Sequence, residues 1–387
     1  MEFKIIDVDA HVQEPADCWT KRMSAKKWGN RIPQLEEVDR DALGATPVGY
    51  FIDPKPQKVH RWTVDAQPHS QYPSTCHAVM PDRETLPARW EDVPKSVYNA
   101  HARLEAMDAD GVDGEVFYPN VGLTFPFFDK EPEFEEECVR AYNDMQVEEW
   151  LDVSERFIPL AMLPFNDIEA TIDELRHASE RGHKGFLMLA APHQKGLPHL
   201  IDSYWDPLWA AAEQLQMPFH FHGGSGAIRM WIDPKPGLSP RFSRAFAGTI
   251  GFNLQAQFIS YVLFSGILNR FPDLQFVVAE SGVGWVPYVL EMCDHEWERC
   301  NLSEHGHPVR PSELFKGHGY VDFWYEQKGL AYHHVIGSDR IMWESDFPHP
   351  TSIWPNSSRY IEGSLGHVTQ QEREMILAGN AKRVYRL

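Results

Sequence analysis

Cysteine is scarce in this sequence and shows no paired spacing. The 387 residues include five cysteines, an odd number, and no two of them form a C-x-x-C pair. This pattern argues against a disulfide scaffold and predicts free thiols in a reducing compartment. The cysteines are scattered along the chain at Cys18, Cys76, Cys138, Cys293 and Cys300.

Long apolar runs are also missing. No stretch is long enough to span a bilayer, and the first residues enter a strand pattern without the basic and apolar regions of a secretory signal. We therefore expect a soluble, cytoplasmic protein with no membrane partner. A G-x-G-x-x-G turn is absent after the first predicted strand, which weakens a dinucleotide-binding interpretation.

Positive charge is in short supply. The chain has 36 Lys and Arg against 56 Asp and Glu, which gives a formal net charge of −20. An acidic surface of this size repels phosphate backbones, so nucleic acid is not an expected partner. A small anionic substrate remains compatible, because a bound cation can reverse the local field.

Residues 12–95 have little periodicity but many prolines and aromatic side chains. A loop of this length inside a compact protein is usually functional or forms a substructure of its own. Because it follows the first strand directly, we expect an ordered lid over that strand end or a subunit contact; the alternative is a partly ordered surface insertion. Its large aromatic residues are Trp19, Trp28, Tyr50, Phe51, Trp62, Tyr72 and Trp90.

From residue 96 onward, short apolar strands alternate with helical patterns. Together with the first strand, the sequence predicts eight strands. They are apolar almost throughout, as strands buried on both faces are. Eight β/α units favour an α/β fold of the (β/α)8 TIM barrel type over an open doubly wound sheet. We expect one barrel domain over residues 1–387, with 12–95 as an insertion. The expected strands are 4–11, 114–118, 157–163, 185–190, 217–222, 274–279, 320–325 and 340–344, and the main helices are 97–109, 132–155, 167–181, 205–216, 254–270, 285–300 and 369–385.

The first strand ends with an acid and a histidine two residues apart. Side chains at i and i+2 of a strand point the same way, so Asp9 and His11 share one face at the carboxyl end of the strand. A carboxylate beside an imidazole can bind one divalent cation. The alternative is a helix-capping aspartate next to a surface histidine.

Three further predicted strands end in metal-ligand or acid–base residue types. His220 and His222 share a face before two glycines, Glu280 follows the sixth strand, and Asp346 follows the eighth. Each residue alone could be structural. Because the chemistry of a barrel lies at the carboxyl ends of its strands, four such ends predict a site at this rim.

With these residues the sequence resembles the amidohydrolase superfamily, in the amidohydrolase-related branch that includes aminocarboxymuconate semialdehyde decarboxylase. The resemblance covers most of the chain except residues 12–95. It is carried by the acid-x-His start Asp9-Ala10-His11, by His222 before Gly223, by Ser345-Asp346-Phe347-Pro348-His349 and by the ending Gly379-Asn380-Ala381-Lys382-Arg383-Val384-Tyr385.

The resemblance implies a set of metal ligands. They are Asp9, His11, His222 and Asp346, with His220 as the fallback for the fifth strand. No lysine ends the fourth strand, since Lys184 precedes it. The branch therefore implies one divalent ion, with Zn expected first and Mn or Fe as alternatives. Together with the aromatic insertion, the resemblance implies a homodimer or a larger homo-oligomer.

The branch supports two kinds of chemistry. We expect first a hydrolase, in which metal-activated water attacks an amide, ester, thioester or activated C–C bond, with Asp346 and Glu280 as catalytic groups. The alternative is non-oxidative decarboxylation of a small aromatic or muconate-like acid, with Asp346 delivering the proton. Glu280 stands where the family commonly has a histidine, and an extra base there favours hydrolysis slightly. The third alternative is a non-catalytic barrel.

Four further residues are candidates for binding a small-molecule substrate. Arg229 could hold a carboxylate and His349 could reach the site from just beyond Asp346. Asn120 follows the second strand and Trp285 could cap the pocket. Each also has a structural alternative: a solvated arginine, a loop histidine, a turn asparagine and a core tryptophan.

Overall fold

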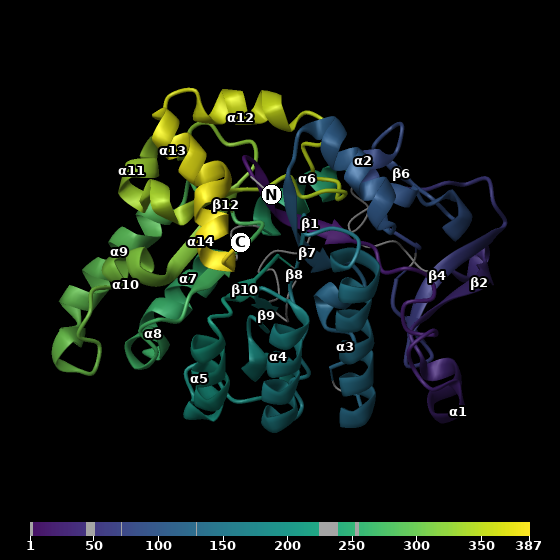
Figure 1. Ribbon diagram of the computed structural model, residues 1–387, viewed down its shortest axis with the longest axis horizontal. Coiled ribbons are helices and arrows are strands. Elements are labelled where there is room, and N and C mark those ends of the chain that lie inside the picture. The colour runs from purple at the N-terminus through teal and green to yellow at the C-terminus, as the bar shows by residue number, and fades with distance from the viewer. Residues whose placement is uncertain (1–2, 44–50, 71, 129, 224–238, 252–254) are drawn as a thin grey trace.

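The computed structural model describes residues 3–43, 51–70, 72–128, 130–223, 239–251 and 255–387. Its centre is a set of eight short parallel strands, all composed of buried residues (Figure 1). They are β1 (Ile6–Val12), β7 (Gly114–Pro119), β8 (Phe157–Pro159), β9 (Phe186–Leu187), β10 (Phe219–Phe221), β11 (Phe276–Val278), β12 (Gly319–Phe323) and β13 (Ile341–Trp343).

The eight strands close into a barrel. Two sheets, β1-β7-β8 and β13-β12-β11-β10-β9, are joined at both edges by isolated parallel bridges, Ala10 with Phe347 and Ala161 with Phe186. Each of the eight predicted strands overlaps one of these strands. The (β/α)8 TIM barrel predicted from the sequence is confirmed.

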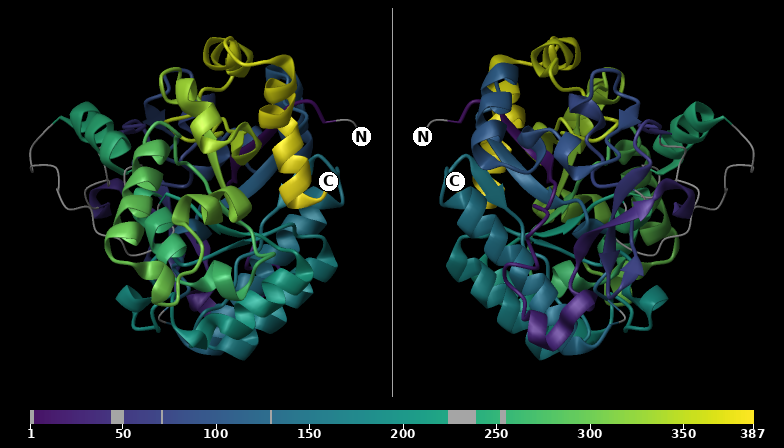
Figure 2. Two further views of the ribbon diagram at one scale, coloured as in Figure 1. Left: turned by 90° about the vertical axis from the view of Figure 1, so that its left-hand side faces the viewer. Right: turned by 90° about the vertical axis from the view of Figure 1, so that its right-hand side faces the viewer.

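Helices follow the strands and form the outer layer (Figures 1 and 2). Among the described residues, none of them is long and apolar enough to cross a membrane. They are α2 (Ala100–Asp110), α3 (Pro132–Gln146), α4 (Ile168–Arg181), α5 (Asp206–Leu215), α6 (Pro240–Gly251), α7 (Gln255–Phe264), α8 (Ile267–Arg270), α9 (Val286–Arg299), α10 (Pro311–His318), α11 (His333–Ile336), α12 (Ser357–Leu365), α13 (Gln370–Glu374) and α14 (Asn380–Tyr385).

Some helices depart from their predicted bounds. α2 begins at Ala100 rather than residue 97, because the Asn99 side chain accepts the Ala102 N–H and so caps the helix there. The predicted helix over 132–155 ends as α-helix at Gln146 and continues as one π-helical turn, Val147–Leu151. Among the described residues outside the insertion, three helices were not predicted: α6, α10 and α12.

The insertion after β1 contains regular structure of its own. Figures 1 and 2 place its purple and blue sheet on the opposite side of the molecule from α9 and α10. The indoles of Trp19 and Trp62 are buried edge to face, 5.6 Å apart, and belong to the main hydrophobic core. Its elements are α1 (Ala25–Trp28), β2 (Gln34–Asp39), β3 (Phe51–Ile52), β4 (Lys58–Val64), β5 (Gln67–Pro68) and β6 (Thr85–Leu86).

Arg103 on α2 is a fully buried cation that ties the helix to the barrel rim. Its guanidinium donates to the Glu115 carboxylate at 2.8 Å and to the His11 carbonyl at 2.6 Å. It also lies 4.3 Å from the centroid of the Phe347 ring. One side chain thus holds together β1, β7 and the segment after β13, and it fixes the backbone of a candidate ligand.

We expect the substitution Arg103→Met to lower the free energy of unfolding by about 3–5 kcal/mol, because it leaves Glu115 buried without its cation. Urea denaturation followed by circular dichroism would measure the loss. The double variant Arg103→Met/Glu115→Gln should recover part of it, since the uncompensated charge is gone. Equal losses in the two variants would contradict the assignment of this ion pair.

Candidate metal centre

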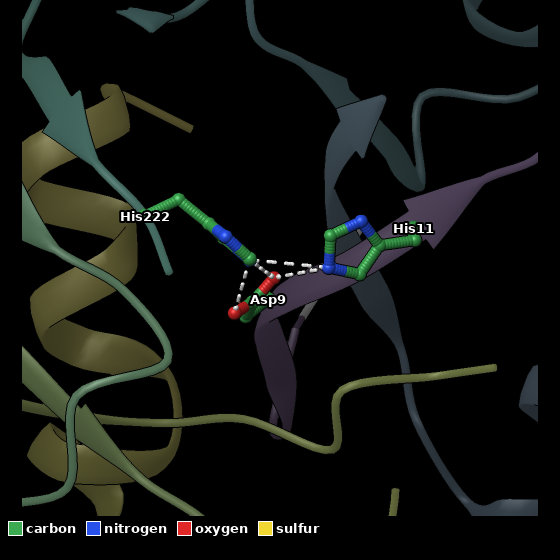
Figure 3. Close-up of side chains that lie close together, drawn as sticks. All are labelled: Asp9, His11 and His222. Atoms are coloured by element: carbon green, nitrogen blue, oxygen red, sulfur yellow. Dashed lines mark hydrogen bonds and ion pairs between the residues drawn. The ribbon is translucent and has the colours of Figure 1, made fainter. Parts of the chain in front are cut away.

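Asp9 and His11 reach the centre from β1, whose pairing with β7 is interrupted between Asp7 and Ala10. An irregularity of this kind re-aims side chains at the rim of a barrel. Figure 3 shows both side chains directed at His222. The His11 Nδ1 lies 3.1 Å from the Pro119 carbonyl oxygen, which can only accept a hydrogen bond. Nδ1 therefore carries the proton, and Nε2 offers its lone pair to the centre.

His222, rather than His220, comes from the fifth barrel strand to join this pair. Its Nδ1 lies 2.5 Å from the Gly223 carbonyl oxygen, which leaves Nε2 facing Asp9 and His11. The His220 ring is directed elsewhere, with Nδ1 2.7 Å from the Tyr118 hydroxyl. Gly185 leaves room for it, because a Cβ there would lie 2.9 Å from His220 Nε2.

The spacing of the donor atoms fits a metal ion. His222 Nε2 lies 3.1 Å from His11 Nε2 and 3.1 Å from Asp9 Oδ2, and His11 Nε2 lies 3.3 Å from Asp9 Oδ1. Ligands about 2.1 Å from one ion are about 3.0–3.4 Å apart for right-angled to tetrahedral arrangements. Asp9 Oδ2 is buried and has no hydrogen-bond partner within the described part of the chain. An orphaned carboxylate oxygen among imidazoles is what an ion would satisfy.

The electrostatics of the three side chains also favour a bound positive charge. Burial lowers the pKa of His222, but the charge and hydrogen bonds of Asp9 outweigh it and raise the pKa to about 10. For His11, burial and neighbouring His349 lower the pKa to about 4. Burial raises the pKa of Asp9, yet the charge of His222 and the hydrogen bond that His222 donates bring it below its usual range. The cluster thus retains a carboxylate and one proton.

Asp346 and His349 approach the same histidine from the segment after β13. Asp346 Oδ1 lies 3.5 Å from His11 Nε2 and 3.0 Å from His349 Nδ1. The Thr351 hydroxyl donates to the other oxygen of Asp346. The backbone of Asp346 is left-handed, with φ of 56°, which is uncommon for a residue with a side chain. His11, Asp346 and His349 form a second group with metal-ligand spacing.

Glu280, the predicted catalytic residue after β11, lies on the other side of His222. Its Oε2 is 3.6 Å from His222 Nδ1. A Cβ on Gly223 would overlap Glu280 Oε2, so a side chain there requires the Glu280 carboxyl group to move. Burial raises the pKa of Glu280 well above its usual range, and the charges of Asp346 and Asp9 raise it further against the opposing effect of His222.

Two further acids lie beneath this site. Burial and the neighbouring Asp9 raise the pKa of Asp322 on β12, while burial and Asp322 raise that of Glu344 after β13. Their carboxylates accept the Ser281 and Glu280 backbone N–H groups and so fix the loop that carries Glu280. Sequence reasoning missed Asp322, although an acid inside an apolar strand was a usable signal.

The predicted substrate-binding residues have different surroundings. Asn120 lies at the rim, where its Oδ1 accepts from the Thr75 hydroxyl at 2.6 Å. The Trp285 indole N–H donates to the Ser281 carbonyl, and the ring packs against the main core at the start of α9. Trp285 is therefore not in the cluster of ionisable side chains. Arg229 lies outside the described residues.

We expect the purified protein to bind about one equivalent of a divalent metal, and His222→Ala and Asp346→Asn to lose most of it. The reason is that each change removes a donor from a closely spaced set. Elemental analysis after dialysis would measure the content, with His101→Ala as the control because His101 is exposed on α2. Wild-type protein that metal salts cannot load would contradict the site.

We expect metal binding to release about one proton at pH 7, because an ion at His222 Nε2 displaces the proton held by a group with a pKa of about 10. The affinity then rises about tenfold per pH unit as pH increases through neutrality. Calorimetric titration in two buffers of different ionisation enthalpy would count the proton. We expect His222→Ala to release no proton on binding the metal. If the wild-type protein also releases none, the assignment of a proton to His222 is contradicted.

The chain is similar both to a named decarboxylase and to a solved amidohydrolase. It is 25% identical over 316 residues to the gamma-resorcylate decarboxylase of Rhizobium sp. strain MTP-10005, which covers 74% of this chain and 86% of the relative. A solved amidohydrolase from Mycobacterium avium subsp. paratuberculosis matches over 100% of both chains, with a TM-score of 0.71 and 21% identity.

A third similar protein was solved with a metal. The dihydroxybenzoic acid decarboxylase of Polaromonas sp. JS666, with bound manganese and the inhibitor 2-nitroresorcinol, has a TM-score of 0.59 and 20% identity. The match covers 77% of this chain and 89% of that one. The model of the amidohydrolase family matches residues 6–387. Because this match extends over nearly the whole chain, the protein belongs to the amidohydrolase family and is an enzyme of that family.

Proposed function

We propose that this enzyme catalyses the metal-dependent, non-oxidative decarboxylation of a small aromatic carboxylic acid. The observation that carries the proposal is the similarity to gamma-resorcylate decarboxylase, which extends over 74% of the chain. The sequence alone favoured hydrolysis, with decarboxylation as the alternative. The relatives whose names state a reaction support decarboxylation, the alternative.

We assign the metal to Asp9, His11, His222 and Asp346. A divalent ion bound by these residues would attract the substrate carboxylate and a neighbouring oxygen and stabilise negative charge that develops on the ring. Imidazole donors suit Zn or Fe and carboxylates suit Mn, so the donor set is compatible with each. The manganese in the Polaromonas protein adds weight to Mn.

The residues of the chain supply the proton and exclude water. In the reaction the bond between ring and carboxylate breaks, CO₂ leaves, and the electron pair stays on the ring carbon. We assign to Asp346 the delivery of a proton to this carbon. Its carboxyl group is fully buried, and the Thr351 hydroxyl fixes one of its oxygens. Burial keeps water away from the carbon before the proton is transferred.

In this scheme Glu280 orients His222 and does not transfer the proton. It contacts His222 from the side away from Asp9, and its backbone N–H is held by Glu344. Removing it should weaken the orientation of His222. We further propose a cytoplasmic homo-oligomer, as expected from the cysteine pattern and the aromatic insertion; sedimentation velocity of the purified protein tests the oligomeric state.

We expect incubation with gamma-resorcylate or another hydroxybenzoate to release CO₂, and in D₂O to place one deuterium on the carbon that carried the carboxylate. Asp346→Asn should lower the rate by at least about 10²–10⁴-fold, because that is the usual contribution of a positioned acid or base and the change also removes a metal ligand. Product analysis by NMR measures both quantities. Asp173→Asn is the matched control, since Asp173 is exposed on α4.

The same assay separates decarboxylation from hydrolysis. A panel of aromatic esters, amides and lactones should remain intact in the presence of the metal-loaded enzyme. Turnover of one of these compounds, with no CO₂ from any hydroxybenzoate, would replace the proposal by the hydrolase assignment.

A further inference from the structure

His349 is held against the metal centre although it lies outside the ligand pattern of the branch. Its ring stacks on that of His11, with the centroids 3.7 Å apart and the planes 29° apart. Its side chain is only 12% exposed, and Nδ1 lies 3.0 Å from Asp346 Oδ1. The turn after β13, closed by the hydrogen bond from His349 N–H to the Asp346 carbonyl at 2.9 Å, returns the imidazole to the site.

The short contact between His349 and Asp346 is not a hydrogen bond. Asp346 Oδ1 is buried and lacks a hydrogen-bond partner among the residues that the structure describes, even though His11 and His349 nitrogens lie within 3.5 Å. Two atoms bound at right angles to one ion, each about 2.1 Å from it, are about 3.0 Å apart. The His349 and Asp346 atoms therefore have the separation of neighbouring ligands.

The far side of the His349 ring indicates which nitrogen is free to bind. Nε2 faces Asn120 Oδ1 at 3.4 Å, and the same oxygen accepts the Thr75 hydroxyl at 2.6 Å. A proton on Nε2 satisfies this oxygen and leaves a lone pair on Nδ1.

The other two histidines are arranged in the same way. His11 and His222 each direct one ring nitrogen at a backbone carbonyl oxygen and the other at the centre. Histidine ligands of metals usually have this outer hydrogen bond, which fixes the tautomer and the ring orientation.

The two groups with ligand spacing share one atom. Asp9, His11 and His222 form one group, and His11, Asp346 and His349 form the other. His11 Nε2 has a single lone pair and can bind only one ion. The two groups do not form one set in this structure, because at least one donor of the second lies more than 4.8 Å from a donor of the first. A single ion held through the shared His11 Nε2 would draw these donors together.

We propose that His349 is a ligand of this ion through Nδ1, so that the centre has three imidazole donors besides Asp9 and Asp346. This inference adds a donor that neither the strand-end pattern nor the decarboxylation itself requires. Three imidazoles shift the preference of the site from Mg toward Zn or Fe. They also make Asn120, held by Thr75 of the insertion, the outer partner of a ligand.

Pulsed electron paramagnetic resonance of the Mn²⁺-loaded, full-length protein counts the coordinated imidazole nitrogens directly. We expect three in the wild-type protein and two in His349→Ala. Mn²⁺ affinity should fall in this variant by at least about 10–100-fold, the loss typical when only an outer partner of a ligand is removed. His334→Ala, which removes an exposed histidine of α11, should leave count and affinity unchanged.

Several outcomes would overturn the inference. Two imidazoles in the wild-type protein would make His349 an ion-pair partner of Asp346, and three in both proteins would assign the third to another histidine. Failure of the wild-type protein to bind Mn²⁺ would also reject it. If His349→Ala does not fold, His349→Gln provides the comparison. Counting the imidazole ligands needs no substrate, so a failure to detect decarboxylation would not affect the assignment of His349. Conversely, a count of two imidazoles would not affect the proposed decarboxylation.

Discussion

Negative charge buried at the carboxyl end of the barrel is the constraint on which the site depends. Asp9, Asp322, Glu344 and Asp346 are fully buried within one rim, and Glu280 adjoins them. Isolated buried carboxylates are too costly to remain charged, so they must be paired, protonated or neutralised by a cation. The imidazoles at this rim are candidate ligands for such a cation, and the backbone N–H groups of Ser281 and Glu280 donate to one oxygen each of Asp322 and Glu344.

The barrel was predictable because its signals are local and repeated. Eight apolar segments separated by helical patterns leave few alternative arrangements, and the structure closes them as expected. The rim was predictable for the same reason, since Asp9 and His11 lie within β1 and Asp346 comes shortly after β13. The strand pattern alone does not distinguish His222 from His220, because the two share one face; the family resemblance chooses His222, and the surrounding Tyr118 and Gly185 account for the different place of His220.

The sequence did not predict the exact placement of the rim side chains, because this placement depends on turns and on neighbours distant along the chain. Glu280 and Asp346 both have left-handed backbone conformations, with φ of 51° and 56°, which no propensity predicts for an acidic residue. These conformations decide where the two carboxyl groups point. His349 returns to His11 only because of the turn that follows Asp346. Asp322 was overlooked because a strand residue is ordinarily assigned to packing.

The fit between Gly223 and Glu280 has a consequence for how this enzyme can diverge. The Glu280 carboxyl group fills the volume that any side chain at 223 would need. A larger residue at 223 is therefore accommodated only if the acid at 280 turns away or is shortened. The residue at 223 thus determines which conformation the acid at 280 can adopt beside His222.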